Sequence, residues 1–113
     1  TLDIDEIFKI RSKYNTKSAV SISLSNKNID LFFNINSQNI ISPFSKNSKM
    51  LPRQKYQNFY ILNGALYLAK REFIFKYKSF IASSTIGYIM PEENSIDIDN
   101  PLDWKIAEFL MSN

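Results

Sequence analysis

Two aspartates stand two positions apart in the run from Pro91 to Phe109, just ahead of a well-marked helix start. Asp97 and Asp99 alternate with isoleucines, so on an extended backbone both carboxylates point to one face. Magnesium binds through one or two carboxylates, water and substrate phosphates, and an Asp-x-Asp pair at a strand end supplies such a partial shell. The pair is therefore a candidate Mg²⁺ site, but acids before a helix also serve as caps or favour the helix dipole.

The absence of histidine and cysteine narrows the chemistry that the chain can carry. Ser-His-Asp and Cys-His mechanisms, disulfides and thiolate metal sites are excluded. The net charge of +3 is scattered from Lys9 to Lys105 without a dense basic run, whereas five of the eleven acids crowd into residues 92–103. This distribution predicts a local anionic site and no nucleic-acid partner.

Length and composition predict one domain at most. With 113 residues, 44% hydrophobic and 14% aromatic, the chain is long enough to bury a core, alone or with a partner. No apolar run approaches the roughly twenty residues of a membrane span, and no signal region opens the chain. We therefore expect no membrane association and a cytoplasmic location. An amphipathic helical pattern at the very first residues also predicts that this is the C-terminal part of something longer.

The hydrophobic spacing predicts the elements that must position the acidic pair. Helical periodicity covers residues 2–14, with a cap at Thr1, and residues 70–77. Strand patterns cover residues 18–24, with one buried face, and residues 65–69 and 85–90. The apolar face of the first strand comprises Val20, Ile22 and Leu24.

The last predicted helix opens with Asn100 as its cap, Pro101 at its first position and Asp103 in its first turn. Its apolar positions predict a buried stripe. The stripe consists of Leu102, Ile106, Phe109 and Leu110.

A hairpin is predicted where two β-prone runs, residues 30–36 and 39–44, flank Ser37 and Gln38. It is apolar on both faces, which predicts self-association, and a polar loop over residues 45–58 follows it. Strands alternating with helices predict an α/β layer architecture with the hairpin as an added subdomain.

Three segments together resemble the acylneuraminate cytidylyltransferase family, the CMP-sialic acid synthetases. They are Arg53-Gln54, the run NGALY from Asn63 to Tyr67, and residues 80–103, in the family's order and spacing. The resemblance implies the C-terminal portion of a three-layer α/β/α sugar-nucleotide transferase-like fold with a mixed sheet and a protruding β-hairpin dimerisation subdomain. Residues 1–113 would be a single part of that domain, with residues 28–56 as the dimerisation hairpin and loop.

The resemblance also implies an enzyme. Such enzymes transfer CMP from CTP to the anomeric hydroxyl of a nonulosonic, sialic-type acid and release pyrophosphate, in the synthesis of bacterial surface polysaccharide. Asp97 and Asp99 would hold Mg²⁺, which draws charge from the phosphates. Arg53, with Gln54 beside it as a substrate contact, would reach from the dimerisation segment into the neighbouring subunit's active site. This implies a homodimer.

The resemblance implies that four further residues form the sugar pocket. Tyr67 and Phe80 would form its apolar wall, although ordinary core aromatics fit the same pattern. Asn63 and Gly64 would lie where the backbone approaches the sugar, although a simple tight turn explains Asn-Gly equally well. Asn63 also favours the nonulosonate branch over the related Kdo cytidylyltransferases, which usually carry His-x-Gly there.

One departure from the family is large. Its glycine- and basic-rich loop, which grips CTP, has no counterpart here, since Gly64 and Gly87 are the only glycines. We therefore expect the N-terminal CTP-binding half to be absent and the chain alone to be inactive. The alternative is a non-catalytic dimerisation module whose acidic segment is only a helix cap. The sugar stays open among N-acetylneuraminate, legionaminate and pseudaminate.

Overall fold

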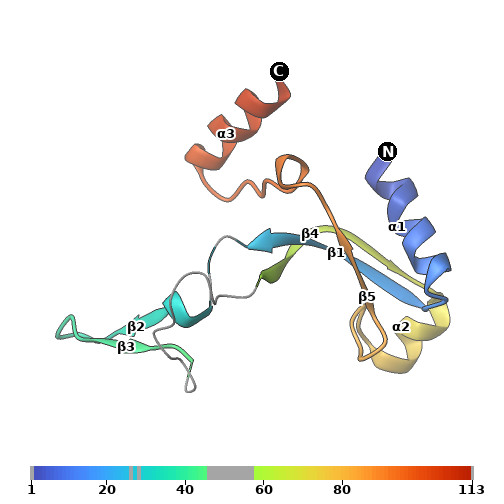
Figure 1. Ribbon diagram of the computed structural model, residues 1–113, viewed down its shortest axis with the longest axis horizontal. Coiled ribbons are helices and arrows are strands. Elements are labelled where there is room, and N and C mark those ends of the chain that lie inside the picture. The colour runs from blue at the N-terminus through green and yellow to red at the C-terminus, as the bar shows by residue number, and fades with distance from the viewer. Residues whose placement is uncertain (1, 26, 28, 46–57, 113) are drawn as a thin grey trace. The chain divides into compact units, whose positions relative to one another are not determined.

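The computed structural model describes residues 2–25, 27, 29–45 and 58–112. The chain divides into two compact units, one made of Thr1–Ser23 with Ile61–Asn113 and the other of Leu24–Tyr60. A three-stranded sheet belongs mainly to the first unit and a two-stranded sheet to the second (Figure 1). Within these ranges, no helix has the length and apolarity needed to cross a membrane.

The three-stranded sheet has the order β4-β1-β5. Its strands are β1 (Ser18–Ser25), β4 (Phe59–Ala69) and β5 (Ile86–Ile89). β1 and β5 are parallel. β4 is antiparallel to β1. Two hydrogen bonds show this direction: the Lys70 N–H bonds to the Lys17 carbonyl, and the Leu66 N–H bonds to the Ser21 hydroxyl. The sheet is therefore mixed and the unit is α/β, as predicted.

Burial along β1 corrects the prediction of a single buried face. Ser18 to Ser21 are all buried, whereas Leu24, predicted to be buried, is exposed. Neighbouring residues of a strand point to opposite sides, so both faces of this central strand are covered in its first half. The buried serines are satisfied by partners: the Ser18 hydroxyl bonds to Thr85 at 2.7 Å and the Ser21 hydroxyl to Asn63 at 2.6 Å.

β4 is longer than predicted, since it begins at Phe59 rather than at Ala65. Asn63 and Gly64 therefore lie inside a strand, and the tight-turn interpretation of Asn-Gly is wrong. Gly64 has a φ of +71°, a left-handed value that is typical of a glycine in a β-bulge. The alternation of β4 is interrupted there, which is why its first half did not stand out as a strand.

The helices agree with the predicted ranges to within one residue at most ends. They are α1 (Leu2–Lys13), α2 (Arg71–Tyr77) and α3 (Pro101–Met111), with short 3₁₀ turns η1 (Ile29–Leu31) and η3 (Glu92–Asn94). α1 lies against β5 and buries Ile7. α2 buries Phe73 and ends where Lys78 takes a left-handed φ of 54°. The cap predicted at Thr1 lies outside the described residues.

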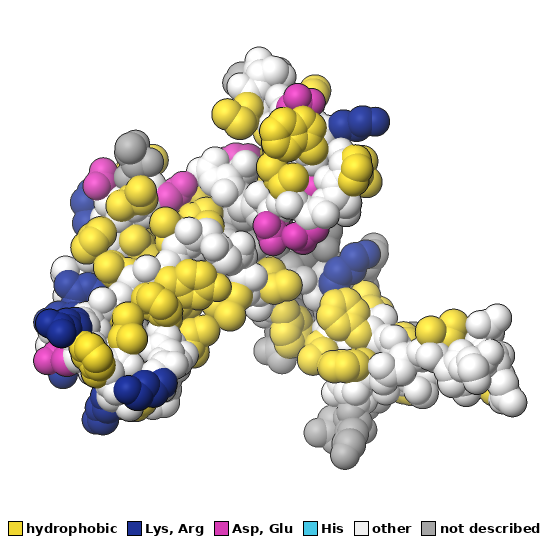
Figure 2. Space-filling view, turned by 180° about the vertical axis from the view of Figure 1, so that it is seen from behind, with side chains coloured by type: hydrophobic (Ala, Val, Ile, Leu, Met, Phe, Trp, Pro, Cys, Tyr) yellow, Lys and Arg dark blue, Asp and Glu magenta, His cyan; other side chains and the backbone are white. Residues whose placement is uncertain are grey.

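The start of α3 is as predicted, but its buried stripe is not. The Asn100 side chain accepts a hydrogen bond from the Asp103 N–H at 2.9 Å, with Pro101 at the first position. No residue of α3 is buried, and Leu102 and Phe109 are 65% and 66% exposed. Hydrophobic side chains lie on the surface of this helix in Figure 2. Helical periodicity predicts which face is apolar, whereas burial also needs a neighbouring element to cover that face.

The predicted hairpin is confirmed in the second unit. β2 (Phe33–Ile35) pairs antiparallel with β3 (Ile41–Pro43). The Asn36 side chain accepts hydrogen bonds from the backbone N–H groups of Gln38 and Ile40, at 2.9 and 3.0 Å, which closes the turn. All residues of both strands are exposed. The predicted loop after the hairpin falls largely on residues 46–57, outside the described residues.

Candidate functional site

The aromatic pair predicted for the sugar pocket comes together in the structure. The ring centroids of Tyr67, on β4, and Phe80, after α2, are 5.4 Å apart with planes tilted by 49°. Tyr67 is 45% and Phe80 37% exposed, so they are not core aromatics. The loop that carries Phe80 is tied down, because the Thr85 hydroxyl accepts from the Ala82 N–H at 2.8 Å. The pair offers a partly open apolar surface.

Gly64 lies on β4 shortly before Tyr67 and leaves open space beside the strand. Apart from its two chain neighbours, no described residue has an atom within 4 Å of a Cβ placed at this position. Glycine is therefore required by the positive φ of 71° and not by crowding. A ligand that approached the backbone at this position would therefore meet no side chain from residue 64.

Asn63 is held within the protein by contacts to two other segments. Its amide oxygen accepts from the Ser21 hydroxyl at 2.6 Å and from the Ala65 N–H at 3.1 Å. Its amide nitrogen lies 3.1 Å from the Ser95 hydroxyl and 3.5 Å from the Met90 sulfur. These contacts join β4 to the central strand and to the segment that follows β5.

The acidic pair lies in an irregular, exposed segment between η3 and α3. The predicted placement at a strand end is wrong, because β5 already ends at Ile89. Asp103 accepts a hydrogen bond from the Asp99 N–H at 3.0 Å, so the capping of α3 also orders the backbone at Asp99. In the described ranges, the carboxylates of Asp97 and Asp99 have no hydrogen-bond or ion-pair partner.

These two carboxylates would form an incomplete ligand set. Within the part of the chain that the structure describes, no three acidic side chains gather where one metal ion could contact them all. Two unpartnered carboxylates fit a magnesium ion that keeps water and substrate phosphates in its remaining positions. They do not fit a closed all-protein cage.

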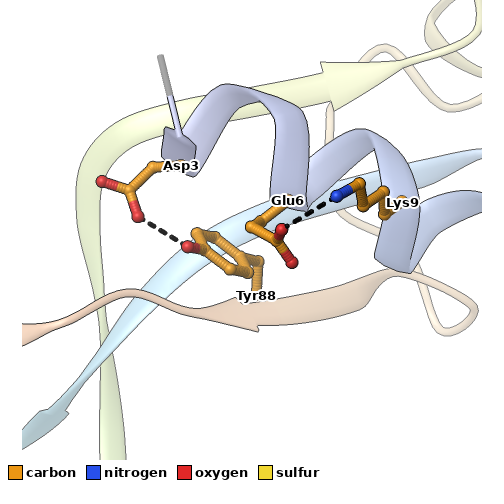
Figure 3. A network of polar contacts seen from close by, with 4 residues as sticks. All are labelled: Asp3, Glu6, Lys9 and Tyr88. Atoms are coloured by element: carbon orange, nitrogen blue, oxygen red, sulfur yellow. Dashed lines mark hydrogen bonds and ion pairs between the residues drawn. The ribbon is translucent and has the colours of Figure 1, made fainter.

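A polar network joins α1 to β5 (Figure 3), and a further hydrogen bond joins α1 to η3. The Tyr88 hydroxyl donates to one Asp3 carboxylate oxygen at 2.6 Å, and the Asn94 amide donates to the other at 3.0 Å. Burial, followed by this hydrogen bond and the negative charges of Asp3 and Glu6, raises the pKa of Tyr88 to about 12. Asp3 thus anchors the segment that leads to the acidic pair.

Sequence reasoning missed the supporting residues Asp3, Ser21 and Ser95. Asp3 lies 85 positions from Tyr88, and Ser21 lies 42 positions from Asn63. No local pattern marks such contacts. Arg53 and Gln54, the two remaining predicted site residues, lie outside the described residues.

Comparison with curated proteins gives a consistent result, although no protein-family model matches the chain. It is 30% identical over 101 residues, 89% of the chain, to an N-acylneuraminate cytidylyltransferase of Streptococcus agalactiae. It is 35% identical over 68 residues, 60% of the chain, to the CMP-N,N'-diacetyllegionaminic acid synthase of Campylobacter jejuni. It is 36% identical over 67 residues, 59% of the chain, to the post-translational flagellin modification protein B of Campylobacter coli.

The chain is a relative of the acylneuraminate cytidylyltransferase family. It spans only about a quarter of the length of these proteins, from 24% to 29%. Similarity over most of the chain thus supports the resemblance that the motifs indicated. The family relation concerns one portion of these longer proteins.

Proposed function

We propose that this chain is part of a cytidylyltransferase that transfers CMP from CTP to the anomeric hydroxyl of a nonulosonic acid and releases pyrophosphate. The observation that carries the proposal is the similarity over 101 residues, 89% of the chain, to an N-acylneuraminate cytidylyltransferase. The contact between Tyr67 and Phe80 supports it, because the two aromatics expected on one pocket wall are neighbours. The proposed fold of the whole domain is the family's three-layer α/β/α arrangement.

The sugar side of the site consists of Tyr67, Phe80 and Gly64. The half-exposed rings offer apolar surface to a sugar ring and its acyl groups. The open space at Gly64 lets a ligand come close to the backbone of β4. Arg53 and Gln54 belong to the proposed site as contacts to a phosphate or the sugar carboxylate.

Asp97 and Asp99 would hold Mg²⁺ in the proposed enzyme. When bound, the ion would neutralise charge on the phosphates of CTP. The contribution of the two carboxylates is to bind and orient it, and their freedom from protein partners in the described ranges suits this role. Positioning and charge neutralisation are the main sources of catalysis expected in such a displacement.

The natural protein tests the proposal in an assay of pyrophosphate release with CTP, Mg²⁺ and each of N-acetylneuraminate, legionaminate and pseudaminate. Asp99→Asn removes a ligand charge at nearly constant shape. Since losing an outer-shell partner already costs about 10- to 100-fold, we expect a loss of at least about 100-fold in Mg²⁺-dependent activity. Glu93→Gln makes the same charge change in the preceding turn and should retain activity.

Two outcomes would contradict the proposal. One is full Mg²⁺-dependent activity in the Asp99→Asn variant. The other is formation of a CMP-sugar by the 113-residue chain alone, since we propose that the residues binding CTP lie outside it.

The second candidate function is a non-catalytic dimerisation module. The exposed apolar strands of the hairpin favour it. It predicts no cytidylyltransferase activity in the natural protein and unchanged self-association in the Asp99→Asn variant. The enzyme hypothesis predicts that this variant loses activity while it still dimerises.

A further inference from the structure

The side-chain amide of Asn63 has no hydrogen-bonding capacity left for a ligand. A primary amide has two acceptor lone pairs and two N–H donors. The Ser21 hydroxyl and the Ala65 N–H occupy the oxygen, at 2.6 and 3.1 Å. The Ser95 oxygen and the Met90 sulfur occupy the two donors, at 3.1 and 3.5 Å. A sugar hydroxyl could bond to this amide only by displacing one of these groups.

The orientation of the amide follows from its partners. The backbone N–H of Ala65 can only donate, so the amide oxygen must face it, and the nitrogen must then face Ser95. Two of the partners are fully inside the protein, since Ser21 is 1% and Met90 3% exposed. The amide therefore serves a buried polar network, where unpaired groups are costly.

This network leads from the central strand to the segment before the acidic pair. The Ser21 hydroxyl, on β1, accepts from the Leu66 N–H at 2.8 Å and donates to Asn63. The Ser95 hydroxyl accepts from Asn63 and donates to the Pro91 carbonyl at 2.8 Å. Ser95 closes η3 and precedes Asp97 by two residues.

The same short segment has a second attachment, to α1. Asn94 donates to Asp3 of α1 at 3.0 Å. Residues 91–95 are thus fixed from β4 through Asn63 and from α1 through Asp3. The chain that continues to Asp97 and Asp99 has no regular secondary structure of its own until α3, so these two attachments and the α3 cap determine where the pair lies.

We propose that Asn63 is a positioning residue that holds residues 91–95 and so sets the position of Asp97 and Asp99, and that it does not bind the sugar. The role of the acidic pair in this statement rests on the proposed function. The attachment of the segment by Asn63 does not.

Hydrogen exchange of the backbone amides of residues 91–99 in the natural protein measures this attachment directly. Ser95→Ala removes the group that receives the Asn63 amide and leaves the Ser21 and Ala65 contacts in place. We expect exchange in this segment to rise about 5- to 10-fold, the effect of losing one net hydrogen bond. Ser95→Thr retains the hydroxyl and should restore slow exchange. Unchanged exchange in Ser95→Ala would overturn the proposal.

Asn63→Ala completes a double-mutant cycle. If Asn63 acts through Ser95, the Asn63→Ala and Ser95→Ala effects on exchange should be clearly non-additive when combined.

Both variants should need more Mg²⁺ for half-maximal activity, with an unchanged KM for the sugar. A raised sugar KM in Asn63→Ala alone, with normal Mg²⁺ dependence, would show a direct sugar contact and refute the proposal. Should Asn63→Ala fail to fold, Ser95→Ala and Ser95→Thr still decide.

The two readouts separate this inference from the proposed function. Faster exchange in a natural protein that never makes CMP-sugar would retain the attachment and remove the cytidylyltransferase assignment. Unchanged exchange in an active enzyme would remove the attachment by Asn63 and retain the cytidylyltransferase assignment.

Discussion

The pKa of the Tyr88 hydroxyl is raised well above its ordinary value. This hydroxyl lies 2.6 Å from Asp3 and its pKa rises from 10.0 to about 12. A raised pKa means that the folded protein holds this proton more tightly than the unfolded chain does. The stabilisation is therefore fully present below pH 10 and is lost as the pH rises through about 12.

A spectroscopic titration of the phenol groups tests this contact. We expect one late tyrosine step near pH 12 in the folded protein, absent in Tyr88→Phe and moved to lower pH in Asp3→Asn, because the carboxylate no longer opposes the phenolate. Asp5→Asn alters a nearby acid of the same helix and should leave the step unchanged. Circular dichroism at each pH verifies the fold. If Asp3→Asn left the late step in place, the contact would be disproved.

Residue-level predictions from the sequence succeeded where the partners are close in the chain. Asn100 was predicted as the cap of α3, and its side chain accepts from the Asp103 N–H, only three positions along the chain. The pairing of Tyr67 with Phe80 was reached through the family resemblance and not through the local pattern. The contact between Asn63 and Ser95, 32 positions apart, was not predicted, because nothing in either local sequence specifies the other.

At the scale of elements, β4 depends on the backbone of Gly64. A residue with a Cβ atom costs about 1 to 2 kcal/mol in the left-handed region, although the space beside Gly64 is open. Gly64→Ala should therefore lower the free energy of unfolding by about 1 kcal/mol in urea titrations. Gly64→Asn is the matched control and should cost less, since asparagine tolerates this conformation better. Equal stability of the alanine variant and the natural protein would contradict the positive φ.

The types of the elements followed from hydrophobic periodicity, but their burial did not. β1 was predicted to have one buried face, but Ser18 to Ser21 are all buried, so both of its faces are covered in its first half. α3 was predicted to bury a stripe, and none of its residues is buried. In each case burial depended on which distant elements cover a face, and a local pattern does not specify those elements.

At the scale of the whole molecule, the hairpin is the surface that we expect to mediate self-association. Its large apolar side chains are exposed, and an apolar surface of this kind favours association in water. They include Phe32, Phe33, Ile35, Ile40, Ile41 and Phe44. A second copy of the protein is the partner that the family resemblance implies.

Sedimentation analysis of the natural protein at micromolar concentration should show a dimer. Ile41→Asp places a charge on β3 and should weaken the dimer at least about 10-fold, because burying an unpaired charge is costly. Gln38→Ala changes only the turn, whose hydrogen bond to Asn36 uses the backbone N–H, and should leave the dimer intact. A natural protein that stays monomeric would contradict this surface assignment.

The amino-acid sequence by itself determined the element types, the α3 cap, the hairpin turn and the family relation. These depend on side chains and backbone groups only a few positions apart, or on motifs that relatives share. Only the tertiary structure decided that Gly64 lies inside a strand with a positive φ, that α3 leaves its apolar face uncovered and that Asn63 joins β1 to the segment before Asp97. Such outcomes depend on which distant groups satisfy a buried donor or cover an apolar face, and packing in three dimensions selects those partners.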